Sequence, residues 1–315
     1  MDNQQKLRGM IEGAILGAVW IILLFLTVYT PAFFITMFLL PAPLTILTFR
    51  RGIKTAMTSA FVVVILSVLF NLFVTGFGLV LYSIVVGLVT GYCLHNKRNS
   101  RVTFVATGLA VLVSNLLSLF FLSVLADYNM ITELTQTMKE SFAMSESIMA
   151  EFGVPPTFDE NYLETMVELL RLMLPSIMIA ASAIIAYIYY QFISYMMKRL
   201  GETVPGLPSF ASFSLPRSIL WYYVFATIGM LIVSADKQTS GFLYMLLFNI
   251  VQILMLVLAL QGMSVVWYHM KKMKWSKIVR IPLLLILFHP LLLQIMTWVG
   301  MFDMFFNWRK LPKKS

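Results

Sequence analysis

Polar side chains that interrupt long apolar runs are where this sequence could bind a ligand. We select five of them, four amides and a tyrosine: Asn71, Tyr82, Asn115, Asn249 and Gln252. Gln191, Gln261 and His289 show no such grouping and are interpreted as structural. An amide both donates and accepts hydrogen bonds without carrying charge, and Asn249 and Gln252, three residues apart, share one face of a helix. The five residues predict a neutral, outward-open pocket for a small polar or heterocyclic solute. The alternative for each amide is a structural hydrogen bond between helices.

Patterns typical of enzymes and metal sites are missing from the sequence. It contains no G-x-x-x-x-G-K-[ST] loop, no H-E-x-x-H pair and no G-x-S-x-G turn. Its one cysteine, Cys93, and three scattered histidines argue against a disulfide or a metal site. An enzyme acting on a lipid would have to use Asp159, Glu160 and Glu164, but clustered acids are usually a solvated surface. We therefore expect no enzyme, no cofactor and no metal.

Long apolar segments must position these polar side chains. Of 315 residues, 60% are hydrophobic and 12% are charged, whereas an ordinary globular domain is ~45–50% apolar. The excess falls in runs of about 20 residues, the length of a helix that crosses a bilayer. We predict an all-α, polytopic helical membrane protein, with residues 1–315 forming one membrane domain. The predicted spans are residues 10–29, 31–49, 55–75, 77–95, 102–126, 172–197, 218–235, 242–269 and 281–306.

Prolines and the basic C-terminal segment bear on how many of these nine predicted spans cross the membrane. Pro290 interrupts the last apolar segment, and a proline removes a helix hydrogen bond and kinks or breaks the helix. The four bases after Trp308 favour the cytoplasm. We therefore predict eight transmembrane helices followed by a broken, re-entrant or interfacial segment, or nine if that segment also crosses. Pro41 and Pro43 predict a bend inside the second span.

The distribution of charge predicts the orientation. The net charge is +9, and the basic clusters, among them residues 50–54, 96–101 and 271–280, fall on every second connection. By the positive-inside rule these connections and the N-terminus are cytoplasmic in a multi-pass protein of the cell membrane. Because the bases flank apolar segments, we expect the lipid bilayer and its anionic headgroups as partners, and no nucleic acid.

The connection 127–171 has the opposite charge. It holds 9 of the 14 acidic residues and 2 of the 23 basic residues, so we place it outside. Apolar residues spaced three or four apart over 131–152 predict an amphipathic helix. A second amphipathic stretch over 163–170 follows the break at G-V-P-P. The prediction is an external, acidic, amphipathic helical hairpin on the outer surface; the alternative is a lid over an external cavity.

Small residues repeat in the first apolar segment, in "EGAILGAV". Gly13 and Gly17 are four residues apart, as are Ala14 and Ala18, so each pair shares a helix face. Small side chains let helices approach closely in a membrane. The face could pack inside the protein or against another subunit, and both interpretations stay open. Glu12 beside it is expected to pair with Arg8 or to reach water.

Four stretches carry a family resemblance: the small-x-x-x-small first helix, "PAPLTILTFRRGIKTAMTSAFV", "VVGLVTGYCLHNKRN" and the closing "GMFDMFFNWRKL". The chain resembles the YybS-like family of bacterial membrane proteins, whose fold implies no established activity. Over residues 10–100 it is more distantly similar to the S components of energy-coupling factor transporters, which have roughly six spans. This chain is much longer, and its acidic insertion is foreign to them.

The second resemblance implies a transport function. It implies a small-solute-binding subunit without its own ATPase, for a solute that the sequence does not name. It also implies that Ala14 and Ala18, flanked by Gly13 and Gly17, dock a membrane coupling subunit. The alternative is a non-transporting membrane scaffold or regulator whose basic loops and bare first-helix face recruit partners.

Overall fold

The fold consists of α-helices throughout the described part of the chain. The structure is a computed structural model that describes residues 3–70, 72–153, 160–235 and 241–309. These residues contain helices α1 to α12 and one short 3-10 helix, and no strand. Helices satisfy every backbone donor and acceptor internally, as hydrocarbon requires. The all-α prediction is confirmed. The chain divides into two compact units: unit 1 is Met1–Leu163 with Met178–Leu207, and unit 2 is Glu164–Ile177 with Pro208–Ser315.

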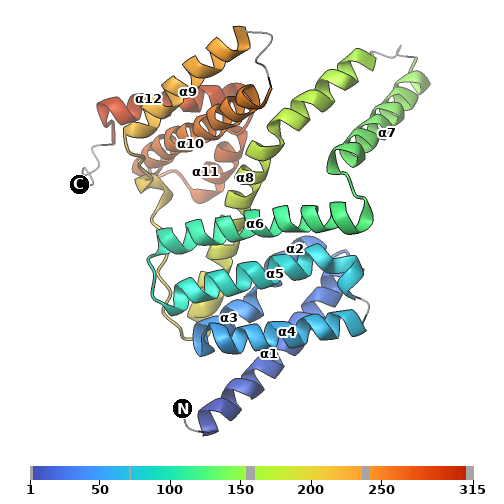
Figure 1. Cartoon of the computed structure of the whole chain (residues 1–315). Helices are drawn as coiled ribbons and strands as arrows, with labels where there is room; N and C mark the ends of the chain where they lie inside the picture. The colour runs from blue at the N-terminus through green and yellow to red at the C-terminus, as the bar shows by residue number, and fades with distance from the viewer. Residues whose placement is uncertain (1–2, 71, 154–159, 236–240, 310–315) are drawn as a thin grey trace. The chain divides into compact units, whose positions relative to one another are not determined.

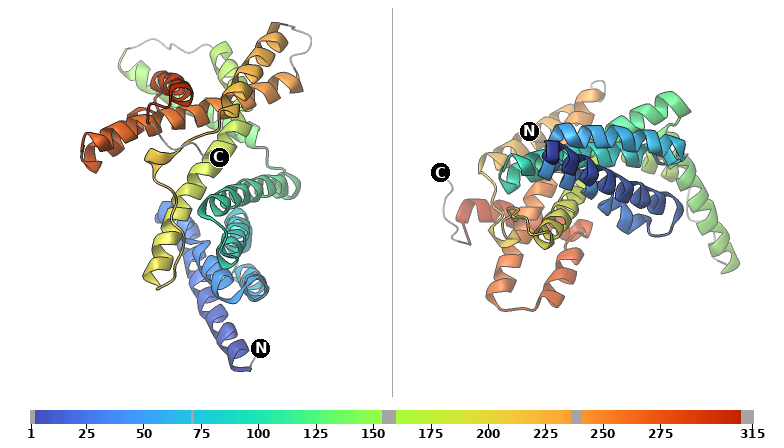
Figure 2. Two further views of the ribbon diagram at one scale, coloured as in Figure 1. Left: turned by 90° about the vertical axis from the view of Figure 1, so that its left-hand side faces the viewer. Right: turned by 90° about the horizontal axis from the view of Figure 1, so that it is seen from below.

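Unit 1 contains the N-terminal helices and most of α8. Its helices are α1 (Asn3–Tyr29), α2 (Phe33–Leu39), α3 (Ala42–Arg51), α4 (Ile53–Leu69), α5 (Leu72–His95), α6 (Ser100–Ala126), α7 (Met130–Glu151) and part of α8 (Glu160–Arg199). In Figures 1 and 2, α5 lies beside α6 along most of its length. The core of the unit forms where α3, α5, α6 and α8 meet.

Close contact between α3 and α5 depends on two glycines. A Cβ atom on Gly91 would lie 2.5 Å from the Cβ of Thr48, and one on Gly87 would lie 2.9 Å from the carbonyl oxygen of Pro41. Only glycine permits this approach, because a larger side chain would overlap the facing backbone. The break between α2 and α3 falls at Pro41. The break lies where the bend in the second span is predicted, and the bend itself stays a prediction.

Unit 2 contains the 3-10 helix η1 (Phe210–Ser212), α9 (Ser218–Ala235), α10 (Phe242–Lys272), α11 (Lys277–Ile286) and α12 (Pro290–Phe306). Its main contact is the crossing of α10 and α12. A Cβ atom on Gly262 would lie 2.0 Å from the carbonyl oxygen of Met296, and one on Gly300 would lie 2.1 Å from that of Leu258. The two backbones therefore touch at these glycines.

Six helical segments among the described residues are long and apolar enough to cross a membrane, or seven if the bent pair α11 and α12 counts as one. The multi-pass prediction is confirmed, but the count of eight is not. The predicted spans 55–75 and 218–235 overlap the shorter apolar helices Ile53–Leu69 and Ser218–Ser234. The 17 residues of α4 cover about 25 Å, less than the ~30 Å of a hydrocarbon core.

The last apolar segment is broken as predicted. The helices Ile278–Ile286 and Pro290–Phe306 meet at an angle of 102°, with Pro290 at the start of α12. Proline lacks the N–H that would continue the preceding helix, and its ring suits a first turn.

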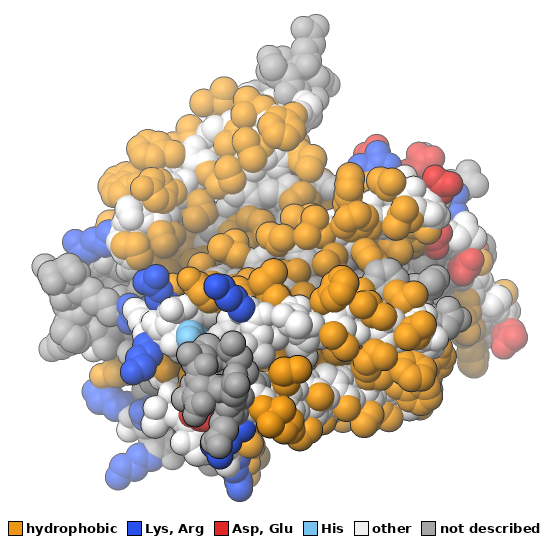
Figure 3. Space-filling model, turned by 60° about the horizontal axis from the view of Figure 1, so that its bottom comes forward, with side chains coloured by type: hydrophobic (Ala, Val, Ile, Leu, Met, Phe, Trp, Pro, Cys, Tyr) orange, Lys and Arg blue, Asp and Glu red, His pale blue; other side chains and the backbone are white. Residues whose placement is uncertain are grey.

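The helices of both units expose large hydrophobic side chains. Ile15 is 59% exposed, Phe61 67% and Leu125 76%, and hydrophobic side chains dominate much of the face drawn in Figure 3. Soluble monomers rarely expose such extensive apolar surface. Lipid contact accounts for it in a membrane protein.

The acidic insertion contains the predicted amphipathic helix, α7, which buries none of its residues. The side chain of Asn129 begins the helix by accepting hydrogen bonds from the backbone N–H groups of Ile131 and Thr132. The second amphipathic stretch is the start of α8, which continues as one helix to Arg199. Residues 154–159, which include Asp159, lie outside the described residues. The external position of the insertion stays a prediction.

Candidate functional site

The five residues of the predicted pocket belong to different parts of the chain. Tyr82 on α5 and Asn115 on α6 lie in unit 1, whereas Asn249 and Gln252 on α10 lie in unit 2. Tyr82 and Asn249 are buried; Asn115 and Gln252 are partly buried. Asn71 lies outside the described residues. The convergence of all five on one pocket therefore stays a prediction.

Asn249 hydrogen-bonds the backbone of α8 beside Pro175. Its Nδ2 donates to the carbonyl oxygen of Leu172 at 2.9 Å, and its Oδ1 accepts from the N–H of Ser176 at 2.8 Å. In an uninterrupted helix these two backbone groups would bond each other. The side chain thus fills an opened helical turn next to a proline, as inserted side chains do at kinks. These contacts correspond to the interhelical hydrogen bond named above as the alternative.

Tyr82 lies in the core of unit 1 beside a pair of hydroxyl groups. The side chain is 6% exposed, and no described residue forms a hydrogen bond with its hydroxyl. Tyr189 packs in the same buried cluster, and its hydroxyl lies 2.5 Å from that of Thr45. The hydroxyls of Ser182 and Ser194 on α8 are likewise buried without a described partner. The buried polar side chains described in unit 1 are therefore mainly hydroxyls.

The small-residue face of α1 divides into two sides. Gly13 and Gly17 are buried and Ala14 and Ala18 are exposed. The hydroxyl of Ser59 on α4 donates to the carbonyl oxygen of Gly13 at 3.2 Å, and a Cβ on Gly17 would lie 3.3 Å from a methyl group of Val63. The glycines are therefore used for packing inside unit 1. The alanines point away from that contact.

Glu12 pairs with the end of α3 and not with Arg8, which was one of the two expectations for this side chain. Its carboxylate accepts hydrogen bonds from Arg50 at 3.1 Å and from Arg51 at 2.7 Å. Arg50 also pairs with Glu202 at 3.0 Å. The glycines explain the difference, because they bring the side of α1 that carries Glu12 close to α3 and α4.

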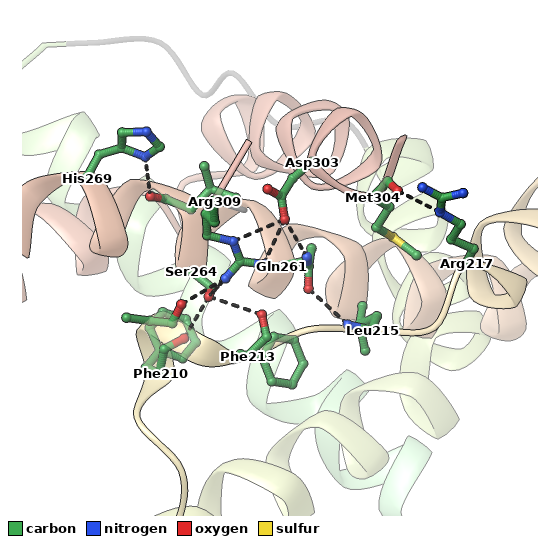
Figure 4. Close-up of polar contacts among 12 residues, drawn as sticks. Phe210, Phe213, Leu215, Arg217, Gln261, Ser264, His269, Asp303, Met304 and Arg309 are labelled. Carbon is green, nitrogen blue, oxygen red and sulfur yellow. Dashed lines mark hydrogen bonds and ion pairs between the residues drawn. The ribbon is translucent and has the colours of Figure 1, made fainter. Parts of the chain in front are cut away.

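A buried charged cluster that sequence analysis missed lies in unit 2 (Figure 4). The Asp303 Oδ2 of α12 accepts hydrogen bonds from Arg309 Nε at 3.1 Å and Nη2 at 2.7 Å, and from Gln261 Nε2 of α10 at 2.7 Å. The side chains of Asp303 and Arg309 are 4% and 1% exposed. The Asp303 Oδ1 is buried without a described partner. Buried charges of this kind are stable only when paired and hydrogen-bonded.

The end of α12 explains how Arg309 reaches Asp303. Asn307 adopts the left-handed conformation, φ 47°, and ends the helix, so the chain turns back on itself. Arg309 Nη1 then donates to the carbonyl oxygen of Ala211 at 3.0 Å and to Ser264 Oγ at 2.6 Å. The cluster therefore ties α10, α12 and η1 together. The sequence feature that could have revealed this ion pair is an aspartate in the apolar run "GMFDMFF", followed six residues later by an arginine.

A cavity of about 380 Å³ adjoins this cluster. It lies between η1 and the C-terminal end of α10, and Ala211 belongs to both its wall and the cluster. We call it the α10 cavity. Its lining consists of two lysines, two serines, a tyrosine and an alanine: Lys271, Lys272, Ser209, Ser212, Tyr268 and Ala211.

The described parts of the chain contain no group of three or more His, Cys, Asp or Glu residues that could hold a metal ion. Among the described residues, the buried polar side chains are mainly hydroxyls in unit 1, and include amides and one ion pair in unit 2. Such groups can bind and orient a ligand by hydrogen bonds.

This architecture defines a multi-pass, all-α membrane protein. The chain belongs to the family described as "Predicted membrane protein (DUF2232)", whose model matches residues 18–304. It is similar to "Uncharacterized protein YybS" of Bacillus subtilis (strain 168), with 22% identity over 317 residues covering 98% of this chain and 100% of that relative. These matches confirm the YybS-like resemblance. They do not extend to the S components, and no solved structure matches.

Proposed function

We propose that the chain is the small-solute-binding subunit of a membrane transport system and has no ATPase of its own. The observation that best supports this proposal is that the hydroxyl of Tyr82 is buried in unit 1 without a described hydrogen-bond partner. An unsatisfied buried polar group costs about 1–3 kcal/mol. A solute that accepts or donates a hydrogen bond there would remove that cost.

The composition of unit 1 supports this proposal. The unit combines six apolar elements: α1, the broken pair α2 and α3, α4, α5, α6, and α8 from Met178 onward. The resemblance to S components implies roughly this number of spans, beginning with a helix that carries small residues. On this proposal, the additional length of the chain is the acidic insertion and unit 2.

The chemistry of the interior supports a neutral solute. The buried polar side chains of unit 1, within its described residues, include no Asp, Glu, Lys or Arg and no amide. A charged solute would need a counter-charge in such an apolar interior. Hydroxyl groups and the aromatic ring of Tyr82 suit a small heterocycle or another uncharged polar molecule. Asn115, partly buried on α6 of the same unit, could contribute a further hydrogen bond.

Ala14 and Ala18 support docking of a coupling subunit. Both are exposed on α1, whereas Gly13 and Gly17 pack against α4. The docking face is therefore narrower than the four small residues and consists of the two alanines. The same exposed face also favours the second candidate, a scaffold that recruits a membrane partner without binding a solute.

A thermal-shift screen of the detergent-purified protein tests the solute site. We expect at least one neutral vitamin or nucleobase to raise the melting temperature, since a ligand of the folded state stabilises it. Tyr82→Phe removes only the hydroxyl and is expected to abolish that rise while the protein remains folded. Tyr92→Phe removes an outward-facing hydroxyl from the same helix and should leave the rise unchanged. A rise that persists in Tyr82→Phe would refute the site.

A further inference from the structure

We propose that the α10 cavity binds the phosphate group of an anionic phospholipid. Lys271 and Lys272 supply two positive charges, and Ser209 and Tyr268 supply hydroxyl donors, whereas the hydroxyl of Ser212 donates to the carbonyl oxygen of Ser209 at 2.7 Å. Ammonium and hydroxyl groups are strong donors to phosphate oxygens. The volume of about 380 Å³ suits a headgroup, with the acyl chains remaining in the bilayer. This site is independent of the solute site in unit 1.

The position of the cavity along α10 favours a lipid over a soluble anion. The candidate span Phe242–Lys272 ends at the two lysines, where a helix leaves the hydrocarbon and meets the headgroups. Tyr268 belongs to the cavity lining, and its neighbour Trp267 stacks under the guanidinium of Arg280 at 4.8 Å. Tyrosine and tryptophan are enriched at this level of a membrane.

No described residue neutralises the positive charge of the cavity. Its lining contains no acidic residue, and neither lysine forms an ion pair with a described residue. The carboxylate of Asp303, in the neighbouring cluster, is paired with Arg309. The two lysines are therefore available to an external anion, and pockets of basic residues at the ends of membrane helices are where anionic headgroups bind.

The buried cluster fixes the wall of the cavity. Arg309 donates to the carbonyl oxygen of Ala211 at 3.0 Å, and Ser264 donates to that of Phe210 at 2.6 Å. These two bonds hold η1 against α10. Arg309 is thus a positioning residue, because it shapes the cavity without belonging to its lining.

The melting temperature of the purified full-length chain, measured with added phosphatidylglycerol or phosphatidylcholine, tests the site. We expect phosphatidylglycerol to raise it more than phosphatidylcholine. Lys271→Gln/Lys272→Gln should lose more than half of this difference. The matched control, Lys54→Gln/Lys97→Gln, removes equal charge from exposed positions outside the cavity and should retain the difference. Ser212→Leu, which obstructs the cavity without changing charge, should reduce it and gives a second test.

Three results would overturn the proposal. Equal stabilisation by the two lipids would show that the phosphatidylglycerol headgroup is not recognised. An equal loss in both double variants would indicate general attraction of basic loops to an anionic surface. Stabilisation by millimolar inorganic phosphate as large as that by phosphatidylglycerol would identify a soluble anion as the ligand.

Discussion

The two units bury different kinds of polar side chain. In unit 1, the described serine and threonine side chains mostly bond their own helix: Ser114 donates to the carbonyl oxygen of Val111, three residues earlier. In unit 2, the main polar bonds join distant segments: Gln261 donates to Asp303, 42 residues later, and Arg309 to the carbonyl oxygen of Ala211.

The difference follows from the chemistry of the side chains. A hydroxyl has one proton and can give it to a carbonyl of the preceding turn. An amide or a guanidinium has more donors than its own helix can satisfy, so its partners must come from elsewhere. The helices of unit 1 are held by small-residue packing, apolar contact and single hydrogen bonds between helices, such as that from Ser59 to the carbonyl oxygen of Gly13. Unit 2 additionally contains a buried network of amides and one ion pair that joins α10, α12 and η1.

The largest expected effect is on the ion pair of unit 2. Arg309→Ala leaves the carboxylate of Asp303 buried and unpaired, and breaking a buried pair costs about 3–5 kcal/mol. We expect a clear fall in the melting temperature, measured by differential scanning fluorimetry. Arg98→Ala, an exposed position, is the control. The double variant Asp303→Leu/Arg309→Met should be less destabilised than Arg309→Ala; an Arg309→Ala variant as stable as the control would contradict the network.

The crossing of α10 and α12 should be the next most sensitive position. Gly300→Ala puts a methyl group 2.1 Å from the carbonyl oxygen of Leu258, and backbone cannot move as a flexible side chain can. Overpacking of this kind typically costs about 1–3 kcal/mol. Gly206→Ala, with no atom within 4 Å of the added carbon, should have no effect on the melting temperature. Equal melting temperatures for the two variants would refute the close crossing.

A small effect is expected for single hydroxyls in unit 1. Ser114→Ala removes a bond to the carbonyl of the same helix at 2.8 Å, and such a bond contributes about 0.5–1.5 kcal/mol at most. Gln261→Leu in unit 2 should cost more, because it leaves the N–H of Leu215 without its acceptor and removes one of the donors to the carboxylate of Asp303. Thermal unfolding of both variants measures the contrast. A larger loss of stability for Ser114→Ala than for Gln261→Leu would contradict the proposed difference between the polar bonds of the two units.

No loss of stability is expected at the outer face of α1. Ala14→Leu/Ala18→Leu adds bulk at exposed positions, so the melting temperature should stay unchanged while crosslinking in native membranes recovers no partner. Gly17→Leu is the contrasting variant, because its side chain would collide with Val63 and lower the melting temperature. A fall in stability for the alanine variant would show that this face packs internally, and partner recovery as in the unchanged chain would refute docking.

Length, hydropathy and proline position were enough to predict much of the fold. The helical class, the interruption between α2 and α3 and the break at Pro290 each depend on a local property of the chain. The number of membrane crossings was harder to predict from the sequence, because α4 contains only 17 residues within a longer apolar run. Where a helix ends inside such a run depends on packing against its neighbours.

The polar contacts were harder to predict than the helices. Spacing places Gly13 and Gly17 on one side of α1, but it does not identify α4 as the surface they meet. Asn249 bonds a turn of α8 more than 70 residues earlier in the chain, and Arg309 reaches Asp303 only because Asn307 reverses the chain. These pairings are properties of the three-dimensional arrangement, and periodicity in one helix carries no information about its neighbour.

Native mass spectrometry of the protein extracted from its own membrane tests the solute-binding proposal most directly. We predict a bound neutral small molecule, seen as a discrete added mass on the unchanged chain and on Tyr92→Phe. The same mass should be lost from Tyr82→Phe. An unchanged chain that carries no added mass, or a Tyr82→Phe variant that carries the same mass at the same occupancy, would contradict a solute site in unit 1.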